Sequence, residues 1–415
     1  MASHNSVKIL EVCPMTPLPS SLDSATTTSL PLTFFDILWL RFPSHSLSVT
    51  LQYFLPLAGM LTWPQDSHKP IINYKEGDAV SLTIAESSAN NFYHLSSNNF
   101  VEAVEYHPFV PDLAISHEQA PVLALQVTTF SNCGLCIGIT THHAVLDGKS
   151  STMFMKSWAH LCKNALSSSL VPDLTPSFDR MVIKDLSRLE TIYLNQWFGI
   201  KNTPPDVVRG TFELTRTNLE KLRQLITNML EEKNEQQQLV VHLSRLTLTW
   251  AYTWVDTKLH LGINVDARPR LEPPIPGNYF GNCISLCGVV AERNDLLGEN
   301  GVAVAAKAIS DAIRSLDDGV LSDAENWLSL FISLLTNKTA DRATGTAGSP
   351  RFELYNTDFG WGKPMKVEMI SIDRTGAISV SDTRDGAGGI KVGLVLKKHE
   401  MKVFASIYAK GLEVL

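Results

Sequence analysis

The chain has 415 residues, of which 44% are hydrophobic and 19% are charged, and its formal net charge is −7 at pH 7. This composition is that of a globular protein, and the length exceeds one ordinary core, so we expect two domains. The acidic balance argues against a general nucleic-acid binder, although a local basic pocket for phosphates stays possible. No apolar run is long enough to span a bilayer, and residues 1–20 lack the layout of a signal peptide. We therefore expect a cytosolic (cytoplasmic) protein that does not associate with membranes.

Strand and helix patterns organise the first half of the chain. A strand is predicted over residues 7–12, and a second one over 122–130. The second strand is predicted to pair antiparallel with an apolar run over 135–141 through a turn at 131–134. Apolar residues at helical spacing predict a helix over 149–165, with its stripe in the core.

The most informative residue follows the strand that ends near residue 141. Because side chains alternate along a strand, we expect His143 to share a face with Ile137, and His142 to point to the other face. Asp147 and Gly148 then predict a turn into the helix. An imidazole titrates near neutral pH, which suits a general base acting on a hydroxyl or an amine. The spacing alone is weak, and a core histidine with one hydrogen bond is the alternative.

The six cysteines include two closely spaced pairs, Cys133 with Cys136 and Cys283 with Cys287. Such spacing invites a zinc or redox interpretation. We reject it because Cys133 lies in a turn, Cys136 lies in the strand that follows, and the second pair lies in an apolar, strand-like segment. A free cysteine is commonly a small buried hydrophobe. We expect no metal site and no disulfide.

The second half contains one long amphipathic helix and a β-rich end. Residues 217–220 form a capping-box pattern, and apolar residues then recur at helical spacing from Leu219 to Leu230. Three short β-rich runs are predicted near the end, over residues 367–372, 377–381 and 390–396. A final amphipathic helix is predicted to start near Lys398.

A second, rarer string completes the pattern that begins at His143. It comprises Asp358, Phe359, Gly360, Trp361 and Gly362. Together the two strings resemble the paired signatures of the plant BAHD acyltransferases, which move acyl groups from coenzyme A thioesters to alcohols or amines. Four further segments are similar to this family in its order: residues 32–36, 54–59, 279–283 and 393–397. The resemblance covers nearly the whole chain.

The resemblance implies an α/β (mixed α+β) fold of the CoA-dependent, chloramphenicol acetyltransferase-like type. Two domains of similar size are expected at 1–180 and 213–415, joined by a crossover linker at 181–212, with the active site in a channel between them. The implied enzyme is a monomer without a tightly bound cofactor. Its implied donor is an acyl-CoA, malonyl-CoA in the branch that it resembles, and its acceptor a phenolic, flavonoid or anthocyanin glucoside. No nucleic acid is expected as a partner.

The resemblance also assigns roles to individual residues. His143 is implied as the general base, and Asp147 as a structural carboxylate that pairs with Arg268. Asp147 could instead orient the imidazole, as a carboxylate does in a catalytic triad. The string at 358–362 is implied to shape the site. Backbone amides and the indole N–H of Trp361 are the candidates for stabilising the oxyanion.

Three further residues concern the donor. Arg180 matches a position where malonyl-transferring relatives hold an arginine against the malonyl carboxylate, a geometry that suits a guanidinium fork. A surface arginine or structural salt bridge is the alternative. Ser349 and Arg351 match a segment near the coenzyme A phosphates.

The sequence departs from the family pattern at two places, after Pro43 and near Val255, where segments expected from the resemblance are missing. Losing a strand exposes a sheet edge and removes core area. The missing segments favour ligand binding by a catalytically degenerate paralogue. Two other functions also stay open: transfer of an aromatic acyl group such as hydroxycinnamoyl, and the condensation reaction of peptide synthesis. A condensation domain shares a histidine string but is not expected to carry residues 358–362.

Overall fold

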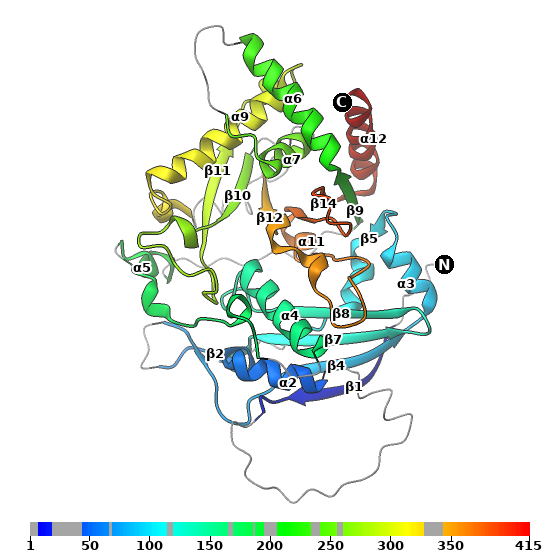
Figure 1. The fold of residues 1–415 in the computed structure, drawn as a ribbon, viewed down its shortest axis with the longest axis vertical. Coiled ribbons are helices and arrows are strands. Elements are labelled where there is room, and N and C mark those ends of the chain that lie inside the picture. The colour runs from blue at the N-terminus through cyan, green and yellow to red at the C-terminus, as the bar shows by residue number, and fades with distance from the viewer. Residues whose placement is uncertain are drawn as a thin grey trace, which may run out of the picture.

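Figure 1 shows a computed structural model of the chain. It describes residues 7–18, 44–65, 69–113, 119–164, 169–185, 187–194, 206–233, 241–254, 260–327 and 343–415. The string at 32–36 and the two positions of apparent deletion, next to Pro43 and at Val255, fall in or beside segments outside these ranges. Two sheets dominate the fold, one in the lower half of Figure 1 and one in the upper half.

The lower sheet has the strand order β1-β4-β7-β8. Its strands are β1 (Lys8–Met15), β4 (Val80–Ser87), β7 (Leu123–Phe130) and β8 (Gly134–Thr141). Strand β7 is central and buried almost throughout, and it pairs antiparallel with β8 in the register Val127 to Ile137. The predicted hairpin and first strand are confirmed.

Both faces of β7 are buried, one by apolar residues such as Leu125 and Val127 and the other by residues that include the polar Gln126 and Thr128. Helices α2 (Ser44–Tyr53) and α4 (Gly148–Lys163) pack on one face, where Trp158 of α4 is fully buried. The indole Nε1 of Trp158 donates a hydrogen bond to Ser46 Oγ in α2 (3.1 Å). A smaller cluster around α3 (Ala89–Ser96) buries Phe130. The helix predicted at 149–165 is confirmed, with its apolar stripe in the core.

The upper sheet has the strand order β11-β10-β12-β13-β14-β9-β5. Its strands are β5 (Val101–Glu102), β9 (Val207–Leu214), β10 (His260–Asp266), β11 (Ile284–Val290), β12 (Ala343–Ala347), β13 (Ile378–Asp382) and β14 (Ile390–Lys397). A third, small sheet has the order β3-β2-β6, formed by Ile71–Asn73, Met60–Thr62 and Gln119–Pro121. The strands predicted at 377–381 and 390–396 are confirmed.

Helices cover the upper sheet and form the largest core. These are α6 (Arg216–Lys233), α7 (Arg245–Trp254), α8 (Arg293–Leu296), α9 (Gly301–Arg314) and α12 (Lys398–Val414), with α5 (Leu189–Leu194) and α11 (Ile372–Thr375) nearer the junction. Buried apolar residues of α6 such as Leu219, Leu222 and Ile226 confirm its predicted stripe. Among the described residues, no helix combines the length and apolarity that crossing a membrane requires.

The two halves share the upper sheet. Strand β5 comes from the first half of the chain, and its Val101 pairs with Arg209 of β9. Strand β9 begins at Val207 and pairs along its length with β14. Residues 207–212, which we expected in the linker, are therefore part of the sheet. The wider division into domains at 180 and 212 stays a prediction.

Two local predictions are wrong. The cap of helix α6 lies two residues before the box predicted at 217–220. Asn218 Oδ1 accepts from Thr215 N (3.0 Å), and Thr215 Oγ1 accepts from Asn218 N (3.1 Å). Glu220 instead pairs with Arg223 (2.7 Å). Residues 367–372 are irregular up to α11, not a strand, because this segment binds through side chains such as Glu368, which pairs with Arg209 (2.8 Å).

Candidate active site

A cavity of about 3490 Å³ lies at the junction of the two halves. His142 and His143 line it from the first half, at the end of β8. Groups of the second half line it too, among them Asn264 of β10, Thr346 of β12 and Trp361. The predicted site between two domains therefore has a physical counterpart, with the two histidines in its wall.

His143 lies in a turn just beyond β8. The strand ends at Thr141, and residues 143–145 form a turn that is closed by a hydrogen bond from Val145 N to His142 O (3.0 Å). The alternation argument therefore does not reach His143, which is exposed, and both histidines line the cavity. Among the described residues, no side-chain or main-chain group bonds the His143 imidazole. Its ring nitrogens are free to meet a substrate.

His142 has a different environment from its neighbour. Burial lowers the pKa of His142, and the charge of His143 lowers it further. The main-chain N–H of Ala144 donates to His142 Nδ1 (3.3 Å), so this nitrogen carries no proton. His142 is thus a neutral side chain that helps to shape the turn, and it adds no positive charge beside His143.

Asp147 is buried, and its contacts are those of a structural residue and not of a base. It is the N-cap of α4, and its Oδ1 accepts from Ser150 N (2.9 Å). Its Oδ2 accepts from Arg268 Nη2 (2.9 Å) and from Cys283 N (3.1 Å). The exposed fractions of Asp147 and Arg268 are 3% and 1%. The ion pair predicted from the sequence is confirmed, and no contact joins Asp147 to either histidine ring among the described residues.

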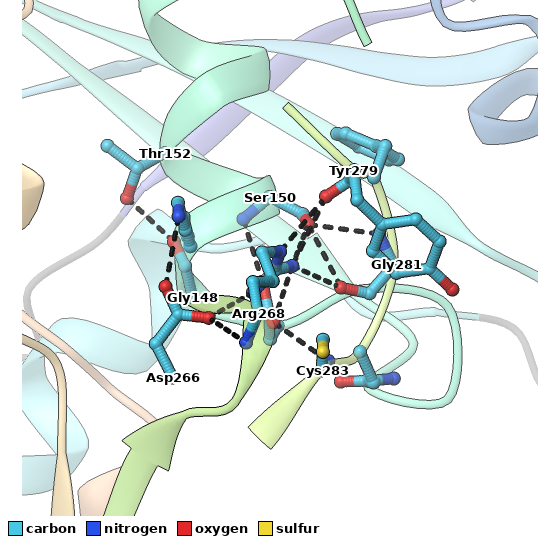
Figure 2. A network of polar contacts seen from close by, with 12 residues as sticks. Gly148, Ser150, Thr152, Asp266, Arg268, Tyr279, Gly281 and Cys283 are labelled. Atoms are coloured by element: carbon cyan, nitrogen blue, oxygen red, sulfur yellow. Dashed lines mark hydrogen bonds and ion pairs between the residues drawn. The ribbon is translucent and has the colours of Figure 1, made fainter. Parts of the chain in front are cut away.

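Arg268 is the centre of a wider network, as Figure 2 shows. Its guanidinium also binds Asp266 Oδ1 (2.9 Å) and the main-chain oxygens of Gly281 (2.8 Å) and Tyr279 (3.2 Å). Burial opposes its charge, but the carboxylate of Asp147 raises the pKa of the guanidinium further. A fully bonded, charged arginine thus joins the start of α4 to the loop before β11.

The same loop is bonded a second time by Ser150. Its Oγ accepts from Gly281 N (3.0 Å) and lies 3.1 Å from Gly281 O. Burial raises the pKa of the Cys283 thiol to about 11, so that thiol is neutral at ordinary pH. The predicted interpretation of Cys283 as a small buried hydrophobe fits this position.

The string at 358–362 forms a turn at the other end of α4. Asp358 Oδ1 accepts from Gly360 N (2.8 Å) and Gly362 N (2.9 Å), and Asp358 Oδ2 pairs with Lys163 Nζ (2.7 Å). The hydrogen bond from Lys163, together with these N–H groups, lowers the pKa of Asp358. Both glycines have positive φ, +102° and +98°, which other residues adopt only with strain.

The aromatic residues of this turn have opposite exposures. Phe359 is buried edge-on against Trp158 of α4, with ring centroids 5.0 Å apart. Trp361 stacks on Phe359 (5.9 Å, 14°), yet 48% of it is exposed. Phe359 therefore fastens the turn to the core, and Trp361 forms part of the cavity wall.

Helix α4 separates the two signature strings. Asp147 caps its first turn and Lys163 is its last residue. A helix of 16 residues is about 24 Å long. The structure therefore places the two strings at opposite ends of one helix and does not bring their carboxylates together.

The residues assigned to the donor lie apart from each other. Ser349 and Arg351 line the cavity, and Ser349 Oγ accepts from Arg351 N (3.2 Å) at the start of a short 3-10 turn. The Arg351 side chain is exposed. Arg180 is not among the described residues of the cavity wall. Its Nη1 donates to Phe280 O (2.6 Å), and its guanidinium lies 5.1 Å from the centre of the Tyr279 ring.

Two residues of the site escaped the sequence analysis. Asn282 donates from Nδ2 to the main-chain oxygen of His143 (2.7 Å), and Lys163 binds Asp358. Asn282 lies within the segment 279–283 that resembles the family, but that string does not say what its amide touches. Lys163 follows Lys149 and Lys156 at seven-residue intervals, a period that marks one face of a helix.

Comparison with known proteins identifies relatives that are all transferases. Residues 39–409 match the family model described as "Transferase family". The chain is 36% identical to phenolic glucoside malonyltransferase 1 of Arabidopsis thaliana, over 99% of this chain and 98% of the relative. It is 37% identical to a malonyl-CoA:anthocyanidin 5-O-glucoside-6''-O-malonyltransferase of that plant, over 100% of both chains. It is 33% identical to a coumaroyl-CoA:anthocyanidin 3-O-glucoside-6''-O-coumaroyltransferase of that plant, over 98% of this chain and 97% of the relative.

Solved structures agree on the fold. Vinorine synthase superposes with a TM-score of 0.69 at 18% identity, over 96% of each chain. A condensation domain of the CDA synthetase superposes with a TM-score of 0.53 at 13% identity, over 99% of this chain and 90% of that one. The alignment with the first malonyltransferase spans 471 positions, more than the 415 residues of this chain, so it opens gaps here. Those gaps agree with the expected shortening.

Proposed function

This chain belongs to the BAHD family of acyltransferases, and from that premise we propose that it transfers an acyl group from a coenzyme A thioester to a sugar hydroxyl of a phenolic or flavonoid glucoside. The observation that carries the proposal is the His143 imidazole, exposed in the wall of the cavity between the two halves without a bonding partner among the described residues. We assign the base role to His143 and a structural role to Asp147.

The reaction needs only one proton carrier. His143 accepts the proton of the acceptor hydroxyl while its oxygen attacks the thioester carbonyl carbon. The tetrahedral oxyanion collapses, the carbon–sulfur bond breaks, and the thiolate takes the proton from the imidazolium. General base catalysis contributes about 10²–10⁴ in rate, and holding both substrates in line contributes more.

We assign stabilisation of the oxyanion to main-chain amides and not to the indole N–H of Trp361. Trp361 belongs to the turn beside Lys163, at the end of α4 remote from His143. Hydrogen-bond donors act on an oxyanion only at contact distance. We therefore assign the Asp358 to Gly362 turn to the support of the cavity wall and not to the chemistry.

Malonyl-CoA is the proposed donor, because relatives named for malonyl transfer reach 36–37% identity and one named for coumaroyl transfer reaches 33%. Ser349 and Arg351 are proposed to meet coenzyme A phosphates, since they combine a hydroxyl and an exposed guanidinium in the cavity wall. The resemblance assigns Arg180 to the malonyl carboxylate. We propose a structural role for it instead, because its guanidinium bonds the main-chain oxygen of Phe280 and lies against the Tyr279 ring.

The test compares two donors on one phenolic glucoside with purified protein. Release of free thiol with malonyl-CoA, and not with coumaroyl-CoA, supports the proposal. We expect His143→Ala to lower kcat by about 10²–10⁴. Coenzyme A binding without turnover would instead indicate a non-catalytic relative. An Arg180→Ala variant that loses malonyl transfer selectively supports its carboxylate role, and equal loss with every accepted donor supports the structural one.

A further inference from the structure

The His143 turn is held by its main chain and not by its ring. His142 N donates to Val122 O (2.9 Å) on one side, and Asp147 is fixed in its ion pair on the other. Between them, the described contact to His143 is the one that its main-chain oxygen accepts from Asn282 Nδ2 (2.7 Å). The orientation of the base therefore depends on a side chain from the other half of the chain.

The main chain around Asn282 is fixed independently of that side chain. Gly281 before it bonds Ser150 Oγ (3.0 Å) and accepts from Arg268 (2.8 Å). Cys283 after it donates to Asp147 Oδ2 (3.1 Å). Asn282 thus projects from a rigid segment, and its amide can hold His143 in place.

The oxygen of the same amide group lacks a hydrogen-bond donor. Asn282 Oδ1 is buried and has no hydrogen-bond partner among the described residues. A buried polar atom without a hydrogen-bond partner destabilises a fold. A small apolar residue would remove this unpaired oxygen, so stability alone does not account for an amide here. The donor at Nδ2, which serves His143, does.

From these contacts we infer that Asn282 is a positioning residue for the general base, an inference that rests on the proposed role of His143. The amide carries no proton in the reaction and acts through the His143 main chain. Displacing a reacting group by 1 Å can lower the rate by about 10². Because Asn282 belongs to the second half, it also makes the geometry of the base depend on the contact between the halves.

The experiment uses two substitutions of Asn282 in the full chain. Asn282→Asp preserves the shape but places an oxygen against the His143 oxygen, and Asn282→Ala removes the amide. We expect kcat with malonyl-CoA and a phenolic glucoside to fall by about 10–100-fold in both variants. The KM for malonyl-CoA and the binding of free coenzyme A should be unchanged, and thermal unfolding reports whether each variant is folded.

Asn278 offers a matched control. Its Nδ2 donates to a main-chain oxygen of the first half, that of Thr175 (3.0 Å), but it makes no described contact to the His143 turn. Asn278→Ala should keep the kcat of the parent. The inference is wrong if Asn282→Asp retains kcat, or if kcat and coenzyme A binding fall together. If His143→Ala retains activity, the proposed base itself is wrong; if it is inactive while Asn282→Asp is active, only this inference is.

Discussion

The two ends of α4 are joined to the second half of the chain by ion pairs of opposite character. At its start, Asp147 and Arg268 are 3% and 1% exposed, and their ion pair is 2.9 Å long. At its end, the side chains of Lys163 and Asp358 are 53% and 24% exposed. Both carboxylates belong to the strings by which the family is identified, yet only one of them is inside the protein.

The difference teaches that signature residues can serve one helix in two physically distinct ways. A buried pair must be complete, because either charge alone would be stranded in a medium of low polarity. An exposed pair exchanges easily with water and contributes little. Three lysines of α4 continue the pattern: Lys149, Lys156 and Lys163 pair with Asp266, Glu353 and Asp358 at 2.9, 3.7 and 2.7 Å. The junction is therefore fixed at one end and adjustable along the rest.

The largest effect is expected from breaking the buried pair. Arg268→Ala leaves the Asp147 carboxylate buried without its cation, so the free energy of unfolding should fall by about 3–5 kcal/mol. Urea denaturation followed by fluorescence measures this change.

A double variant supplies the control for charge. Asp147→Asn combined with Arg268→Met removes both charges and should be more stable than Arg268→Ala alone, since no unpaired charge remains. If Arg268→Ala lowers the free energy of unfolding by less than about 1 kcal/mol, the buried pair contributes no more than a surface pair. The two ends of α4 would then not differ in this way.

A middle-sized effect is expected from the backbone of the exposed turn. Gly360→Ala and Gly362→Ala force alanine into φ values of +102° and +98°, which costs about 1–3 kcal/mol of stability. Neither position is crowded: a Cβ at Gly362 meets nothing within 4 Å, and one at Gly360 meets Lys163 Cα at 3.7 Å. The two variants should therefore lose similar stability through strain alone.

Gly277 is the matched glycine for this comparison. A Cβ there meets only Lys149 Nζ at 4.0 Å, and its φ is not positive. Gly277→Ala should leave the midpoint of thermal unfolding unchanged or slightly raised. If the Gly360 or Gly362 variant loses activity at unchanged stability, the turn contacts substrate and its assignment to structural support is wrong.

The sequence predicts well what depends on local pattern. The β7–β8 hairpin, α4, the stripe of α6 and the last two strands follow from periodicity of apolar residues. The pairing of Asp147 with Arg268 was predicted from the family resemblance, since no periodicity connects residues 121 positions apart. The predictions from periodicity concern which residues are buried, and burial leaves a clear trace in the sequence.

The sequence fails where a side chain replaces a main-chain partner. Residues 367–372 have the composition of a strand but do not form one. Their contact to the upper sheet runs through a side chain, that of Glu368, which pairs with Arg209 of β9. Thr215 and Asn218 cap α6 in place of the predicted box, because an asparagine oxygen accepts where a glutamate was expected. The contact from Asn282 to His143 is of the same kind: one amide, 139 residues away, with no period to reveal it.

The smallest effect is expected from the exposed end of α4. Lys163→Ala removes the pair with Asp358 but leaves the N–H groups of Gly360 and Gly362, so the loss should be at most about 1 kcal/mol, and smaller in high salt. Lys163→Arg should keep the parental stability at every salt concentration.

The same pair predicts a pH dependence, because the pKa of Asp358 in the folded protein is lowered, chiefly by the hydrogen bond from Lys163. Its contribution is therefore complete above the unfolded pKa and disappears as pH falls through the folded value. Lys163→Ala should accordingly differ from the parent at neutral pH and converge with it in acid. A difference that persists in acid, or that salt does not reduce, would show that the end of α4 is held by something other than this charge pair.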